Sequence, residues 1–157
     1  MPNTKGRHLR RMEKEYRVET GSAGPLDLHM VAAWAIKTQR WEAHPRSLIN
    51  QCAREIAGAL RNEYFTDAKG RRVRAKHSVK TTRNGTLIGL WDDIRTATRT
   101  HMDVSFKQRR EQVVGDCRQL KTDVDSYNDA HPDEGVIQLV LDFTMDVAEL
   151  EAAQNAA

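Results

Sequence analysis

The hydrophobic residues in the first part of the chain recur at helical spacing. In residues 8–19 the apolar side chains lie three or four positions apart, and basic residues occupy the other faces. Residues 26–41 carry a broader apolar stripe, with Asp27 as an N-cap or first-turn acid. Two glycines and a proline in residues 21–25 separate these segments, because they interrupt helices. The pattern therefore predicts two helical segments joined by a short break. The first is either a packed helix or a basic arm that becomes ordered on phosphate.

A third helix is expected after His44-Pro45, since the residue before a proline is disfavoured in the α region. Ser47 is the predicted N-cap. The apolar stripe that should face inward consists of Leu48, Ile49, Cys52, Ile56, Ala57, Leu60 and Tyr64. About five residues join the second and third helices, so we expect them to pack against each other.

The pattern changes to alternation in residues 72–91, around Asn84-Gly85. This pair predicts a two-residue hairpin turn, because Asn and Gly accept the positive φ that both central positions need. The expected register pairs Val79 with Leu90, Lys80 with Gly89 and Thr81 with Ile88. One face of the ribbon is apolar, with His77 expected as a core or boundary residue on it. The other face carries the cations Arg72, Arg74, Lys76 and Lys80.

Residues 94–128 contain no proline and one glycine, and they predict one long helix starting near Thr98. A heptad seam runs along it through Phe106, Val113, Cys117, Leu120, Val124 and Tyr127. Arg110 interrupts the seam at an expected core position, where a polar residue can set register. The narrow stripe favours a homodimer through residues 106–127, and the alternative is a helix laid across its own domain.

After the loop at 131–135, the β-branched run 136–143 predicts a short strand, followed by an acidic helix over 142–153. Such a strand needs a partner edge, which could be the hairpin, a second copy or another protein. The pattern does not choose among these.

Charge divides the chain more sharply than its net value of +3 suggests. Residues 1–91 carry 18 Lys and Arg against 8 Asp and Glu, whereas residues 92–157 carry 7 against 14. The first part should attract a polyanion and the second should be repelled by one. The acidic end could also bind a protein partner, or mask the basic hairpin.

Taken together, the patterns predict a mainly α protein with a β-hairpin, an α+β fold. Its element order resembles a winged helix-turn-helix core, followed by a long C-terminal helix and a short terminal strand. The expected domains are a basic nucleic-acid-binding domain at 1–91, a dimerisation arm at 92–131 and an acidic strand and helix at 132–157. Three helices followed by a hairpin would place the third helix against base edges and the hairpin on phosphates.

The predicted function is binding of nucleic acid, most readily duplex DNA, by a small transcriptional regulator or accessory subunit. Trp91, at the end of the hairpin, could stack on a base or pack within the protein. The predicted contact residues are Asn50, Gln51, Arg54, Arg61, Arg72, Arg74, Lys76, Lys80 and Arg83. The alternative is a protein–protein interaction module, or a small subunit of a larger bacterial or phage assembly, in which the basic hairpin meets an acidic protein surface and the long helix docks on a partner. The cations of the hairpin could also serve only to protect an exposed sheet edge from pairing.

Enzyme chemistry finds little support, and we expect no catalytic residues, metal site or cofactor. The six histidines form no i, i+3 or i, i+4 pair, and the phosphate-binding and nucleophile motifs are absent. Asp92-Asp93 could hold Mg²⁺ for phosphodiester chemistry, but acids there more often cap the following helix. The two cysteines lie far apart, and no apolar leader or membrane span is present. These features predict a cytoplasmic protein.

Overall fold

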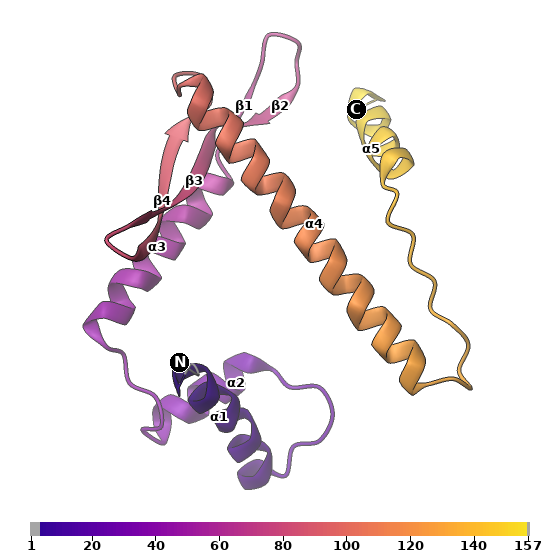
Figure 1. Ribbon diagram of the computed structural model, residues 1–157. Coiled ribbons are helices and arrows are strands. Elements are labelled where there is room, and N and C mark those ends of the chain that lie inside the picture. Colours follow the sequence, from indigo (N-terminus) through magenta and orange to yellow (C-terminus); the bar gives the residue numbers. More distant parts are fainter. Residues whose placement is uncertain (1–3, 157) are drawn as a thin grey trace. The chain divides into compact units, whose positions relative to one another are not determined.

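The computed structural model describes residues 4–156 and has a mixed α+β fold, as predicted (Figure 1). Its helices are α1 (Thr4–Thr20), α2 (Leu28–Lys37), α3 (Pro45–Arg61), α4 (Arg99–Ala130) and α5 (Thr144–Ala156). Its strands are β1 (Tyr64–Thr66), β2 (Arg72–Arg74), β3 (Lys76–Arg83) and β4 (Thr86–Asp93). The chain divides into two compact units, Met1–Ala59 and Leu60–Ala157, which are described separately below.

In the first unit, α1 packs on α2, as their apolar stripes predict. Met12 of α1 and Val31 of α2 are buried in this contact. The ring of Trp34 packs edge-on against the ring of Tyr16, with 5.5 Å between centroids. Asp27 is the N-cap of α2 and accepts a hydrogen bond from the backbone of His29, which confirms its predicted role.

The third helix differs from the prediction in two respects. It begins at Pro45 rather than after a Ser47 cap, since a proline suits the first position of a helix. None of its residues is buried, and Ile49 is 70% exposed, so the expected packing of its apolar stripe is wrong for the single chain. The connecting loop explains this result. The backbone nitrogens of Arg40 and Trp41 bond back to Ala35, so the loop caps α2 rather than folding α3 onto it.

In the second unit, β3 and β4 form the hairpin predicted around Asn84-Gly85. Both turn residues have positive φ, 51° and 74°, and Val79 pairs with Leu90 in the expected register. The predicted cationic face is corrected in one respect. Arg72 and Arg74 belong to a second, shorter hairpin formed by β1 and β2. The two hairpins meet at Ala75, which is 1% exposed and bonds to Glu63 and Ile94 through its backbone.

The long helix α4 begins at Arg99, as the predicted start near Thr98 requires, and Thr98 is its N-cap. Its first turns lie along β3 (Figure 1). The hydroxyl of Ser105 donates to the carbonyl of Ser78, at 2.8 Å. The carboxamide of Gln108 bonds both the N–H and the C=O of Lys80, at 2.8 and 2.9 Å. Side chains of α4 therefore occupy the outer edge of β3 and protect it from pairing with another strand.

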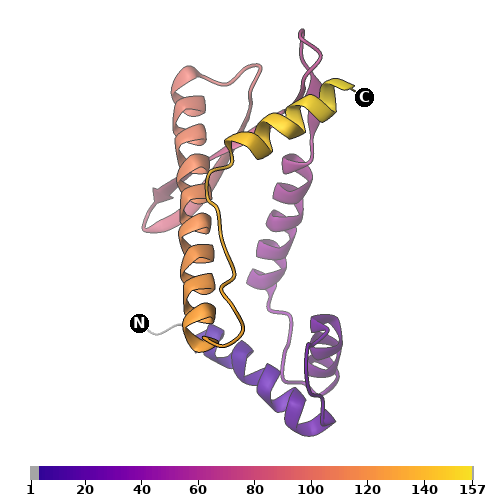
Figure 2. The ribbon, with the colours of Figure 1, turned by 90° about the vertical axis from the view of Figure 1, so that its right-hand side faces the viewer.

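Residues 136–143 form neither a strand nor a helix, so the predicted terminal strand is wrong. A strand needs a row of backbone partners, and α4 already covers the outer edge of β3. The segment leaves the end of α4 as an extended chain (Figure 2). The side chain of Asn128, in α4, bonds both the N–H and the C=O of Ile137. It supplies the two hydrogen bonds that a neighbouring strand would otherwise make. The acidic helix that follows, α5, is present as predicted.

Among the helices of the described residues, none combines the length and the apolar character of a membrane span.

Candidate nucleic-acid interface

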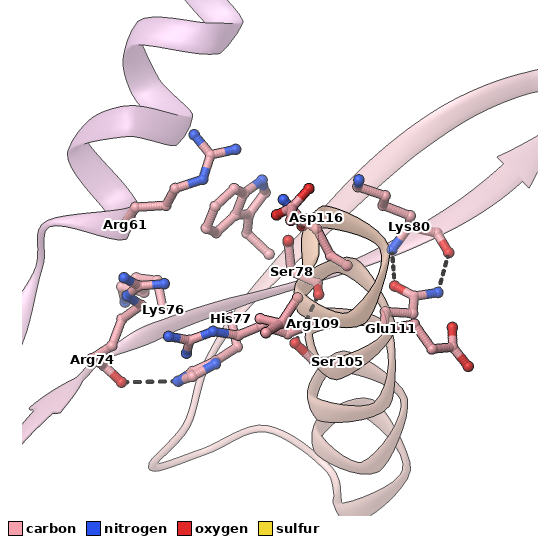
Figure 3. A pocket seen from close by; sticks show the side chains of 14 residues that line it. Arg61, Arg74, Lys76, His77, Ser78, Lys80, Ser105, Arg109, Glu111 and Asp116 are labelled. Atoms are coloured by element: carbon pink, nitrogen blue, oxygen red, sulfur yellow. Dashed lines mark hydrogen bonds between the residues drawn. The ribbon is translucent and has the colours of Figure 1, made fainter. Parts of the chain in front are cut away.

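A groove of about 690 Å³ lies in the second unit, between the hairpin and the first half of α4 (Figure 3). Basic side chains from four elements converge on it. They are Arg61 at the end of α3, Arg74 of β2, Lys76 and Lys80 of β3, and Arg109 of α4. The acidic residues in the lining are Glu111 and Asp116. The groove therefore carries more positive than negative side chains.

The alternation of β3 and β4 places the cations on one face of the hairpin. Lys76 and Lys80 share this face with Trp91, which pairs with Ser78 across the strands. Opposite Lys80 stands Gly89, which has no side chain to fill the space beside the indole. A Cβ added at Gly89 would lie 3.6 Å from the indole nitrogen of Trp91. Because Gly89 has no side chain, this face of the hairpin is open between the side chain of Lys80 and the indole ring of Trp91.

Trp91 is partly exposed and lies close to the cation at the end of α3. The guanidinium carbon of Arg61 is 5.5 Å from the centre of the indole ring, within the range of a cation–π contact. An indole beside basic groups is the combination with which proteins stack bases and hold phosphates of single-stranded nucleic acids. Here the two components come from separate elements, α3 and β4.

The cations of the groove differ in how far the protein neutralises them. Lys76 pairs with Asp93 at 3.0 Å and with Glu63 at 3.9 Å. Arg61, Lys80 and Arg109 have no ion-pair partner among residues 4–156. These last three cations are called the unpaired trio below. Arg74 also has no ion-pair partner among these residues, but it is partly buried and donates to the hydroxyl of Tyr64, whereas the trio is exposed and open to an anion.

Arg74 lies between the groove and the hydroxyl of Tyr64. Its guanidinium donates to that hydroxyl at 3.4 Å, and this bond lowers the pKa of Tyr64 below its usual value. The Nε atom of Arg74 is buried and has no hydrogen-bond partner. A buried donor without a partner carries a free-energy cost, which here falls on Arg74.

Asp93 has a structural task. Its carboxylate accepts hydrogen bonds from the Arg95 side chain and backbone and from Lys76, and these bonds hold its pKa well below the usual range. The carboxylate oxygens are thus engaged by cations of the protein itself. Asp93 therefore links Lys76 of β3 to Arg95, in the segment that leads into α4.

Other predicted contact residues lie outside this groove. Arg72 covers the ring of Tyr64, with its guanidinium 3.9 Å from the centroid, and lines a second groove of about 690 Å³. Arg83 is exposed at the turn of the hairpin. Asn50, Gln51 and Arg54 are exposed on α3, in the first unit. The structure therefore brings together Arg61, Arg74, Lys76 and Lys80 from the predicted set.

Sequence reasoning missed Arg109. The helix that carries it was interpreted only through its heptad seam, as a dimer arm. A signal was nevertheless available, because Ser105, Gln108, Arg109 and Gln112 fall on one polar face at intervals of three and four residues. That face lies beside β3 and lines the groove.

Comparison with known proteins adds no assignment. No family model matches the chain, and searches of curated proteins and of solved structures return no significant match.

Proposed function

We propose that this protein binds nucleic acid, with its groove holding the phosphate backbone and with duplex DNA as the expected ligand. The observation that supports the proposal most directly is the unpaired trio, Arg61, Lys80 and Arg109. These cations come from three elements and line one groove without an ion-pair partner among the described residues. Like charges brought together repel one another, and bound phosphates would relieve that repulsion.

The finer parts of the proposal concern how the rest of the chain contributes. Three helices followed by a hairpin is the element order of a winged helix. In that arrangement Arg83, at the hairpin tip, would reach a minor groove, and Asn50, Gln51 and Arg54 would approach base edges. Such a protein would act in the cytoplasm as a small regulator or accessory subunit.

The direct test is fluorescence anisotropy with a labelled duplex at low salt. The test variant replaces Arg61, Lys80 and Arg109 with glutamine. A matched control replaces three exposed cations of the same unit that lie outside the groove, Lys69, Lys107 and Arg118. We expect the wild type and the control to bind and the groove variant to lose most of its affinity. No binding by the wild type at low salt would reject the function.

A second candidate function is that of a protein–protein adaptor. The exposed apolar stripe of α3 favours it, because Leu48, Ile49 and Ile56 are 54 to 70% exposed. An adaptor of this kind would use the basic hairpin against an acidic protein surface. The anisotropy experiment separates the two candidates, since only a phosphate binder should bind nonspecific duplex at low salt.

A further inference from the structure

The apolar seam of α4 is covered by its own chain mainly at its ends, where the ring of Phe106 packs edge-on against His77 and the ring of Tyr127 stacks on His131. The buried residues of α4 are Met102 and Ser105, both in its first two turns. Beyond them, Val113, Leu120 and Tyr127 are 52, 47 and 45% exposed, although they occupy successive equivalent positions of the heptad pattern. An apolar stripe repeated over three heptads is the pattern by which one helix packs against another.

The seam occupies its own sector of α4. At 100° per residue, it lies roughly a quarter of a turn from Ser105, which contacts β3. Near the other end of the helix, residues 136–141 lie beside the seam, and they line one pocket together with Lys121, Val124 and Asp125. The middle of the seam, with Val113 and Leu120 exposed, therefore lies between two contacts within the chain, and a helix of a second copy can approach it there. From Phe106 to Tyr127 it is about 32 Å long at 1.5 Å per residue.

Charge is unevenly distributed along the same helix. Residues 99–114 contain four basic and two acidic residues, whereas residues 115–130 contain two basic and four acidic residues. Two copies side by side in the same direction would place like-charged halves together. Two copies in opposite directions would place the basic half of each beside the acidic half of the other, which is the favourable arrangement.

Arg110 strengthens the preference for opposite directions, because it occupies a seam position. In a parallel pair this guanidinium would face its own copy across the seam, and two cations would be buried together. In an antiparallel pair it would lie near the acidic end of the partner helix, where Asp123 and Asp125 flank the seam. We propose that two copies of this chain associate through antiparallel packing of α4, over residues 106–127.

The orientation can be measured with spin labels. An antiparallel pair that overlaps the whole seam has its two-fold axis near Cys117. In a Cys52→Ser chain, the spin labels on Cys117 of the two copies should then be close together. Labels on Lys107→Cys, with both native cysteines replaced by serine, should be separated by about 28 Å along the helix axis. Short distances at both positions would show a parallel pair and overturn the proposal.

Dependence on the seam is tested with two adjacent valines of equal exposure. Val113, in the seam, is 52% exposed, and Val114, outside it, is 51% exposed. We expect Val113→Asp to raise the dimer dissociation constant at least about tenfold, because it places a charge among apolar groups. Val114→Asp should change it less than about threefold. Light scattering that finds a monomeric wild type, or equal effects of the two substitutions, would refute the proposal; circular dichroism checks that both variants remain helical.

Discussion

The salt dependence of binding gives the sharpest test of the groove. When Lys and Arg neutralise phosphates of B-DNA, counterions are released, and the logarithm of the binding constant falls linearly with the logarithm of salt concentration. The slope is about 0.9 for each phosphate contact. Replacing the unpaired trio with glutamine removes three such contacts if all three cations meet phosphates. Because Lys76 already pairs with Asp93 and Glu63, we do not count it among the expected contacts.

The expected size of the effect follows from this count. Three contacts correspond to a slope difference of about 2.7 between wild type and variant. Between 50 and 200 mM salt, the wild type should therefore lose about 40-fold more affinity than the variant does. The control replacing Lys69, Lys107 and Arg118 carries the same change in net charge. It should keep a slope within about one unit of the wild type, because these residues lie outside the groove.

The measurement is a series of anisotropy titrations with one labelled duplex at several salt concentrations. Plotting the logarithm of affinity against that of salt gives each slope directly. Equal reductions in slope for the groove variant and the control would mean that net charge alone governs binding. A groove variant with the wild-type slope would refute the assignment of these cations to phosphate contact.

Four further results are expected. Trp91→Ala should weaken binding of a single strand by about 1–3 kcal/mol if a base stacks on the indole, measured against the same strand with Trp91→Phe as control. Ser105→Ala should lower the free energy of unfolding by about 1–2 kcal/mol in urea, because it leaves the carbonyl of Ser78 without its buried donor. Burial lowers the pKa of His77, so the unfolded chain binds a proton more readily than the folded chain does. The melting temperature should therefore fall as the pH drops below about 6.5, and His77→Gln should reduce that fall. Deleting residues 144–157 should tighten DNA binding if α5 masks the cations, since Glu151 lines the second groove together with arginines; unchanged affinity would discard masking.

Local signals predicted the local structure well. The turn at Asn84-Gly85, the register of its strands, the N-cap Asp27 and the start of the long helix near Thr98 depend on residues close together in the chain. Each of these features is decided by backbone sterics or by a single hydrogen bond, so it can be predicted without knowledge of the rest of the fold. The mixed α+β class followed from these same elements.

Predictions that required a partner surface were less reliable. The apolar stripe of α3 has helical spacing, yet spacing does not reveal which surface covers it, and in the single chain it is exposed. The run 136–143 has β-branched residues, yet among the described residues it pairs with no strand. The break at Ala75 was missed for a similar reason. Only tertiary hydrogen bonds to Glu63 and Ile94 mark it as the junction of two hairpins.

The candidate site shows the same division between local and tertiary information. Alternation along β3 correctly grouped Lys76 with Lys80, because side chains of a strand alternate between its faces. Arg109 comes from a helix that begins about 20 residues after β3 starts, and its place beside Lys80 depends on how that helix crosses the sheet edge. Periodicity could identify the polar face of α4 but not the surface that this face meets.

Much of the second unit depends on α4, which uses different sectors for different contacts. The sector of Ser105 and Gln108 satisfies the outer backbone groups of β3, and this same contact brings Arg109 to the groove. Near its other end, Asn128 satisfies the backbone of Ile137 in the same manner. In both places a carboxamide supplies the donor and the acceptor that a neighbouring strand would provide. Because the helix closes these edges with side chains, edge-to-edge strand pairing is blocked at β3, while the apolar seam between the two contacts stays accessible.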